Sequence, residues 1–236
     1  MSKWILLELS EYSLSNMDID LILLDKYINN LQVPILRFYS WKKKTISLGR
    51  NQDINDINID FCRKNNIRIL KRPTGGKAVF HQGDFTYSLV ASKKDGFSTN
   101  IHESYLKISK AIIYSLKLAF PNLNLQIGEE NTRNYSKEAF CFESSTISDI
   151  NINGKKIVGS AQFRKGDYFL QHGSIILNQD FELLKGIFSN NLKFKLTSFY
   201  LNLGYIPDYE TIKNCIIKGF REYFNIEFTY KSFNEI

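Results

Sequence analysis

The stretch Lys71-Arg72-Pro73-Thr74-Gly75-Gly76-Lys77-Ala78-Val79-Phe80-His81 follows an apolar run, Ile67 to Leu70, and contains a proline, two adjacent glycines and then a second apolar run. This pattern predicts a strand, a tight loop and a second strand. Adjacent glycines let the main chain approach whatever lies in the loop, because no Cβ stands in the way. Arg72 and Lys77 add positive charge on either side of the glycines. The loop can therefore face an anion or a polarised carbonyl with its N–H groups.

Two other interpretations of this loop have different chemistry. A Gly-Gly pair between strands is often only a turn, and spacing alone leaves that interpretation open. A P-loop ends in Gly-Lys, as Gly76-Lys77 does, but it needs a glycine five residues earlier and Ser or Thr after the lysine. Lys71 and Ala78 stand at those positions, so we exclude a P-loop.

The composition is that of a soluble globular protein. The chain has 236 residues, of which 43% are hydrophobic, 14% aromatic and 23% charged, enough to bury a full core. No apolar run approaches the roughly 20 residues that a membrane helix requires. The apolar segment near Met1 is too short for a signal peptide and closes at Glu8. We expect one domain, residues 1–236, in the cytoplasm.

The formal net charge of +7 favours an acidic partner. Its densest basic run, Lys42-Lys43-Lys44, is typical of a solvated turn. We find no nucleic-acid-binding motif, so neither nucleic acid nor a membrane is an expected partner. Three widely spaced cysteines form no disulfide framework, and three histidines lack ligand spacing, so no metal site is expected.

Hydrophobic spacing of three and four residues predicts helices at about 15–30, 57–64, 101–120 and 208–224. Alternating runs predict strands at 34–39, 45–49, 67–70, 84–90, 123–127, 147–152, 155–163, 168–177 and 226–230, the first two paired across the lysine turn. Asn153-Gly154 predicts a type I′ hairpin, and residues 128–138 a polar mobile loop. Hairpins packed with helices give an α+β class with mixed, largely antiparallel sheets.

Three sequence blocks together resemble the biotin/lipoate protein ligase and octanoyltransferase superfamily. They are Arg72-Pro73-Thr74-Gly75-Gly76 with Ala78-Val79, His81 and Thr86-Tyr87-Ser88; Gly154-Lys155-Lys156-Ile157 with Gly159-Ser160-Ala161-Gln162; and Gln171-His172-Gly173-Ser174. The resemblance covers nearly the whole chain and implies a biotin/lipoate ligase-like catalytic domain. Lys77 departs from the usual glycine or arginine, and Ser144-Ser145 from the usual Ala-Pro.

Within this superfamily the string Cys141-Phe142-Glu143 resembles the nucleophile loop of the cysteine-dependent octanoyltransferases. The resemblance implies Cys141 and Lys156 as the catalytic residues. It also implies substrate contacts by Arg72, Gly75, Gly76, Lys77, Ala78, His81, Gly159, Ser160, Ala161, His172 and Gly173, although each histidine is equally compatible with a buried structural role. Cys62 and Cys215 are expected to be core thiols.

The chemistry agrees with that assignment. A cysteine thiolate exchanges one thioester for another at little cost, and a nearby cation such as Lys156 would lower the pKa of its thiol. The resemblance implies transfer of octanoate from acyl carrier protein to a lysine of a lipoyl domain or glycine cleavage H protein, by a monomer without cofactor.

Three alternatives remain open. An ATP- and magnesium-dependent lipoate–protein ligase usually carries a further C-terminal domain, for which the chain is expected to leave no room. An amidotransferase between lipoyl domains would use the same thioester chemistry. A basic binding module without catalysis would bind in a strongly salt-dependent way.

Overall fold

A large sheet and a small sheet form the centre of the protein in a computed structural model that describes residues 1–11, 13–128, 149–188 and 195–236. In the large sheet, eight strands run in the order β11-β1-β2-β6-β10-β9-β8-β7. The strands are β1 (Ser2–Glu8), β2 (Ile35–Tyr39), β6 (Asp84–Ser92), β7 (Leu125–Ile127), β8 (Ile150–Ile152), β9 (Lys155–Lys165), β10 (Tyr168–Ile176) and β11 (Ile226–Tyr230).

The large sheet is parallel at one edge and antiparallel elsewhere. Strand β1 runs parallel to both β11 and β2, whereas β6, β10, β9, β8 and β7 pair antiparallel in turn. The α+β class with mixed, largely antiparallel sheets is thereby confirmed. The hairpin between β8 and β9 turns at Asn153 and Gly154, whose φ angles of 50° and 73° are those of the predicted type I′ turn.

The small sheet holds the glycine loop that connects Lys71 to Val79. Its order is β4-β3-β5, with β4 (Arg68–Lys71), β3 (Thr45–Leu48) and β5 (Val79–His81). The predicted pairing of residues 34–39 with 45–49 is wrong, because β2 pairs with β1 and β6 while β3 pairs with β4 and β5. The chain that crosses the lysine turn therefore passes from one sheet to the other.

Six α-helices are described: α1 (Asn16–Lys26), α2 (Ile59–Lys64), α3 (Ile101–Ala119), α4 (Phe181–Phe188), α5 (Phe199–Leu203) and α6 (Tyr209–Phe224). Ser15 caps α1 in a capping box with Asp18. A π-helical turn, Tyr27–Leu31, extends α1 where the sequence predicted its end. Helices α4 and α5 and strand β1 were not predicted. No described helix is long and apolar enough to cross a membrane.

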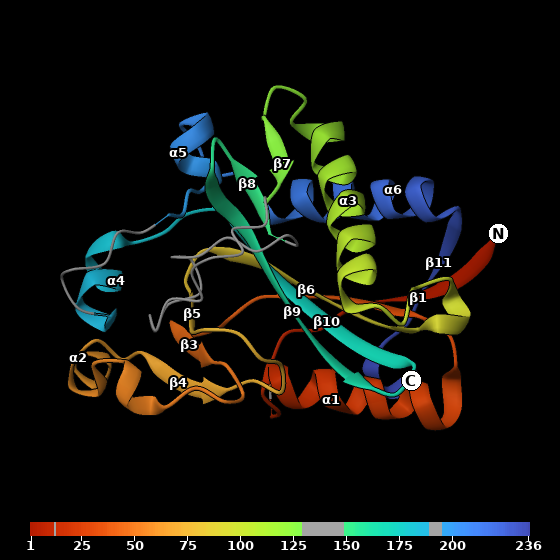
Figure 1. Ribbon diagram of the computed structural model, residues 1–236, viewed down its shortest axis with the longest axis horizontal. Coiled ribbons are helices and arrows are strands. Elements are labelled where there is room, and N and C mark those ends of the chain that lie inside the picture. Colours follow the sequence, from red (N-terminus) through yellow and green to blue (C-terminus); the bar gives the residue numbers. More distant parts are fainter. Residues whose placement is uncertain (12, 129–148, 189–194) are drawn as a thin grey trace.

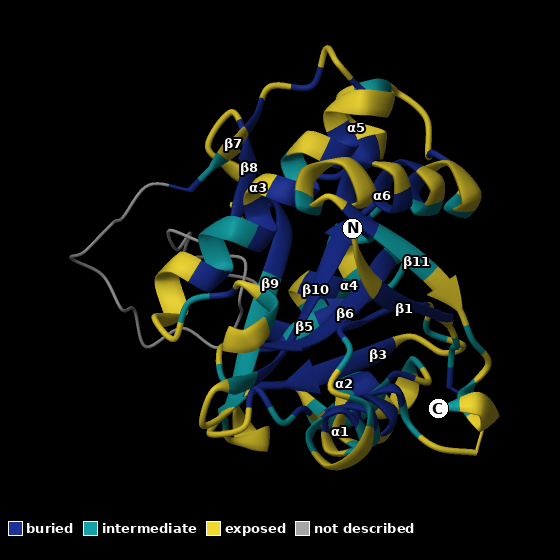
Figure 2. Cartoon of the chain, turned by 90° about the vertical axis from the view of Figure 1, so that its right-hand side faces the viewer, coloured by how far each residue is buried: buried dark blue, intermediate teal, exposed yellow. Residues whose placement is uncertain are grey.

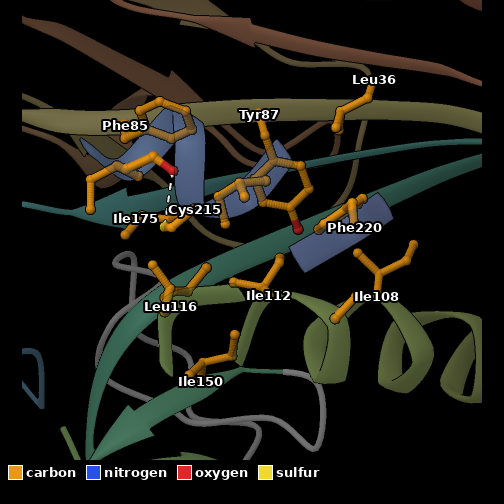
Figure 3. Packing of buried hydrophobic residues seen from close by; sticks show 14 of the residues in the cluster. Leu36, Phe85, Tyr87, Ile108, Ile112, Leu116, Ile150, Ile175, Cys215 and Phe220 are labelled. Atoms are coloured by element: carbon orange, nitrogen blue, oxygen red, sulfur yellow. Dashed lines mark hydrogen bonds between the residues drawn. The ribbon is translucent and has the colours of Figure 1, made fainter. Parts of the chain in front are cut away.

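The helices cover the sheets on both sides (Figure 1). Helices α3 and α6 bury one face of the large sheet, and Figure 3 shows Ile108, Ile112 and Leu116 of α3 directed toward this core. Helix α1 covers the opposite face through Ile19, Leu23 and Leu24, whereas α2 and α4 cover the small sheet. The strands are mostly buried and the helices expose their outer sides (Figure 2).

Candidate active site

A pocket opens where the small sheet meets the middle of the large sheet. It encloses about 440 Å³ of space, the open mouth included. Its wall combines the small sheet and its loop with β6, β9 and β10. The lining residues are Met17, Tyr39, Trp41, Ser47, Arg72, Gly76, Val79, His81, Thr86, Gly159, Ser160, Ala161, His172, Gly173 and Ser174.

The guanidinium of Arg72 shapes the loop that borders the pocket. Its Nη2 donates to the carbonyl oxygens of Gly75 and Lys77 at 2.8 and 2.7 Å, and its Nη1 to that of Ser47 at 2.7 Å. Gly76 has a φ of 88°, and a Cβ there would lie 2.9 Å from Arg72 Nη2. The loop is therefore folded around its own arginine, which fixes how its N–H groups are displayed.

His172 belongs to a buried chain of hydrogen bonds under the pocket. Its Nδ1 lies 3.2 Å from Asp20 Oδ2 and its Nε2 lies 2.8 Å from Thr74 Oγ1. Burial lowers the pKa of His172, an effect that Asp20 only partly offsets. The ring is thus neutral at pH 7. A neutral imidazole has one donor and one acceptor nitrogen, so Nδ1–H can donate to Asp20 while Nε2 accepts from Thr74.

Asp20 is fully buried and ties three segments together. Arg37 Nη1 donates to it at 2.6 Å and Ser88 Oγ at 2.7 Å. Burial alone would raise the pKa of Asp20, but the Arg37 charge and the His172 hydrogen bond outweigh burial and bring it below its ordinary value. The carboxylate is therefore ionised, and it fixes the orientation of the His172 ring.

His81 is oriented in a similar way by a second carboxylate. Its Nδ1 lies 2.8 Å from Asp84 Oδ2 and its Nε2 lies 2.8 Å from Ser47 Oγ. The Trp41 ring stacks on the imidazole with centroids 4.0 Å apart. Ser174 Oγ donates to the same Asp84 oxygen. Both pocket histidines are therefore held by hydrogen bonds at each ring nitrogen, which suits a rigid wall.

Gly173 allows β10 to pass close beside its neighbours in the pocket. A Cβ at this position would lie 2.5 Å from Ser160 Oγ and 2.6 Å from the Tyr87 ring. Tyr87 Oη and Ser160 Oγ are hydrogen-bonded at 2.8 Å, and burial raises the pKa of Tyr87 to about 12. A larger residue than glycine at position 173 would therefore force the Ser160 and Tyr87 side chains to move.

Lys156 lies on β9, three residues before the lining residue Gly159. Its Nζ lies 2.8 Å from Asp149 Oδ1, and the two side chains are 3% and 2% exposed. Asp149 immediately precedes β8, so one hairpin supplies both members of this buried ion pair.

Comparison with known proteins assigns this chain to a family. The model of the lipoyl protein ligase A/B catalytic domain matches residues 13–220. The chain belongs to this family. It is 39% identical to the Octanoyltransferase LipM of Carboxydothermus hydrogenoformans, over 90% of this chain and 83% of that relative. It is 34% identical to the Octanoyltransferase LipM of Clostridioides difficile, over 97% of this chain and 89% of that relative. The resemblance predicted from the three blocks is confirmed.

Solved structures share the lipoyl protein ligase A/B fold. A lipoate–protein ligase A bound with ATP aligns with a TM-score of 0.79 at 24% identity, over 98% of this chain and 89% of its own. The bipartite lipoate protein ligase of Thermoplasma acidophilum, described with its E2 lipoyl domain, aligns with a TM-score of 0.76 at 22% identity, over 98% and 88%. At these identities the likeness concerns the fold.

Most of the predicted substrate residues of this lipoyl protein ligase A/B member meet in the pocket. Its wall contains Arg72, Gly76, His81, Gly159, Ser160, Ala161, His172 and Gly173. Gly75, Lys77 and Ala78 lie in the bordering loop but do not line the pocket. Lys156 does not line it either, and Cys141 falls outside the described residues. The catalytic and substrate roles of all these residues stay predictions.

Three carboxylates near the site were not predicted: Asp20, Asp84 and Asp149. Asp84 was predicted only as part of a strand. Asp20 lies 152 positions from its partner His172, so sequence spacing gave no signal for the pair of Asp20 and His172. Asp149 and Lys156 lie on the two strands of a predicted hairpin, but its register places Asn151 opposite Lys156, so strand pairing alone did not single out Asp149. Among the described residues, no group of three His, Cys, Asp or Glu could hold a metal ion.

Proposed function

We propose that this protein is an octanoyltransferase of protein lipoylation, which moves an octanoyl group from octanoyl-acyl carrier protein through a thioester on Cys141 to an acceptor lysine. The acceptor is a lipoyl domain or a glycine cleavage H protein. The enzyme works as a single domain and a monomer in the cytoplasm, without cofactor. Similarity to Octanoyltransferase LipM proteins over 90% and 97% of the chain carries the proposal.

The pocket supports an acyl substrate. Its lining includes the apolar side chains of Met17, Trp41 and Val79 and the small residues of β9. The imidazoles of His81 and His172 have their ring nitrogens engaged with protein partners. Such a wall offers a tail few competing hydrogen bonds, which suits a saturated chain better than a polar one.

Two substitutions at the acyl carbon complete the transfer. The Cys141 thiolate attacks the donor thioester, a new C–S bond forms, and the carrier thiolate leaves and takes a proton. The acceptor amine then attacks the Cys141 thioester, a C–N bond forms, and the enzyme thiolate is released while the amine loses its proton. Lys156 as a cation would favour the thiolate in both steps.

Transfer without nucleotide tests the activity. The protein is incubated with octanoyl-acyl carrier protein and a lipoyl domain, and the intact mass of the lipoyl domain is recorded. We expect octanoylation without ATP and its loss when the acceptor lysine is replaced by arginine. Modification that requires free lipoate or octanoate with ATP and magnesium would instead establish a ligase. Transfer only from an octanoylated or lipoylated domain would establish an amidotransferase.

A further inference from the structure

The buried pair of Asp149 and Lys156 points to a residue with a role in the reaction that the sequence motifs did not single out. We propose that Asp149 is the positioning residue of Lys156: its carboxylate keeps the ammonium protonated and aimed. The inference rests on the proposed function for its catalytic part only. The ion pair itself, 2.8 Å long with side chains 3% and 2% exposed, is independent of any substrate.

A buried lysine needs such a partner to act as a cation. Burial disfavours the charged form of an amine and can lower its pKa by several units. An opposite charge within hydrogen-bonding distance reverses that preference. Lys156 lies almost out of solvent, and the Asp149 carboxylate, 2.8 Å from its Nζ, is a partner of this kind. A neutral amine gives no charge stabilisation to a thiolate.

Both members of the pair are also fixed through their backbones. The Gly128 N–H donates to the Asp149 carbonyl at 2.8 Å, at the end of β7. The Lys156 N–H donates to Lys195 O, and the Thr197 N–H donates to Lys156 O, both at 2.9 Å. Strand pairing places Asn151 opposite Lys156 within the hairpin. These backbone hydrogen bonds fix the positions from which the two side chains of the ion pair extend toward each other.

The pair also lies on the strand that builds the pocket. Gly159 of β9 is three residues beyond Lys156, about 10 Å along an extended strand. Asp149 is eight positions after Cys141 in the sequence. A purely structural pair would only join the start of β8 to β9. It would alter stability when broken and leave the turnover of folded protein unchanged.

Asp149→Asn separates these roles, because it keeps the shape of the side chain and removes the charge. We expect the rate of acyl-enzyme formation at saturating octanoyl-acyl carrier protein to fall about a hundredfold, the effect of a misplaced catalytic group. The KM for the donor should stay within about twofold, since the pocket wall is unchanged. Asp149→Glu should recover at least about a tenth of the wild-type rate.

A matched control accounts for lost stability. Ile216→Ala, on α6, opens a cavity in the hydrophobic core but leaves both charges of the ion pair in place, and it lowers stability by a core mechanism. Assayed below its melting temperature, it should keep the wild-type rate. Equal rate losses in Ile216→Ala and Asp149→Asn would assign the effect to stability and overturn the positioning role.

A spectroscopic readout tests the pair without any turnover. In protein with ¹⁵N-labelled lysine, a buried ion-paired ammonium is protected from exchange with water and should give a distinct Nζ resonance. We expect a resonance that Lys156→Arg removes, that Asp149→Asn loses and that Asp149→Glu retains. If Asp149→Asn does not fold, the wild-type spectrum decides, and absence of a protected Lys156 signal overturns the inference.

The two readouts separate failure of the inference from failure of the proposed function. If the wild-type protein forms no acyl-enzyme but shows the protected ammonium, the ion pair of Asp149 and Lys156 is supported and the octanoyltransferase assignment is refuted. A wild-type protein that transfers octanoate, with Asp149→Asn turning over within twofold of it, would keep the enzyme and refute the positioning role.

Discussion

His172 shows how one buried side chain makes the stability of the pocket depend on pH. Its neutral ring joins Thr74 to Asp20 with both nitrogens engaged, and burial holds its pKa below the ordinary histidine value of 6.5. The unfolded chain therefore binds a proton at a higher pH than the folded protein does. The stability that the neutral ring contributes is complete above about pH 6.5 and is lost as the pH falls toward the folded pKa.

The free energy of unfolding should therefore decrease as the pH is lowered below about 6.5. One proton gives a slope of at most about 1.4 kcal/mol per pH unit. His172→Asn should remove that part of the slope in urea unfolding measured between pH 7 and pH 5. His102→Asn, on the exposed first turn of α3, is the control and should leave it. Parallel pH curves for wild type and His172→Asn would contradict this explanation.

The two adjacent glycines of the Arg72 loop should respond differently to alanine. Gly76 has a φ of 88° and its Cβ would press on Arg72, whereas a Cβ on Gly75 would meet nothing within 4 Å. Gly76→Ala should cost at least about 1–2 kcal/mol of unfolding free energy. Gly75→Ala should leave that free energy unchanged or raise it by up to about 1 kcal/mol. Urea denaturation of both variants tests this, and equal losses would refute the loop geometry.

At the scale of elements, the hairpin of β8 and β9 brings Asp149 and Lys156 together. Its turn needs positive φ at both Asn153 and Gly154. Replacing both residues with alanine should lower the unfolding free energy by about 2–4 kcal/mol, since each alanine is strained there. Lys155→Gln, in the same hairpin but exposed, should change it by less than about 0.5 kcal/mol. A double alanine variant as stable as wild type would argue against the type I′ turn.

Sequence periodicity predicted those elements whose pattern is local. Helix α3, the β8–β9 turn and strand β11 lie where apolar spacing and turn residues place them. The predicted pairing partner of β3 was wrong. Alternation of apolar and polar residues shows which face of a strand is apolar, but it does not show which other strand pairs with it. Strand β1 was considered only as a possible signal segment. Helix α5 has five residues, too few for a helical period to be recognised.

The candidate site divides in the same way. Blocks of adjacent residues marked the loop, β9 and β10, and most of those residues meet in the pocket. The carboxylates that orient the two histidines come from other elements, and Asp20 reaches His172 from α1. Such a contact depends on how helix and sheet pack, which no local pattern encodes. A buried Asp20 could not be predicted from the sequence, because its ion-pair partner Arg37 becomes its neighbour only in the folded structure.

At the scale of the whole molecule, the net charge of +7 bears on how a carrier protein is reached. Opposite charges on an acidic carrier would steer encounter, and salt screens such steering. Raising ionic strength from about 0.01 M to about 1 M shortens the screening length from about 30 to about 3 Å. We expect kcat/KM for octanoyl-acyl carrier protein to fall at least about tenfold. An uncharged octanoyl thioester of a small thiol should show little change, and an equal response of both donors would exclude steering.

In the proposed reaction, one thiol of this chain carries the octanoyl group between donor and acceptor. Cys62 and Cys215 are poor candidates, because burial raises the pKa of their thiols to about 11 and about 12. The direct measurement is the intact mass of the protein after incubation with octanoyl-acyl carrier protein alone. We expect one octanoyl adduct that hydroxylamine removes, that persists in Cys62→Ser and Cys215→Ser, and that is lost in Cys141→Ser. Absence of the adduct from wild type, or its survival in Cys141→Ser, would exclude Cys141 as the carrier of the octanoyl group.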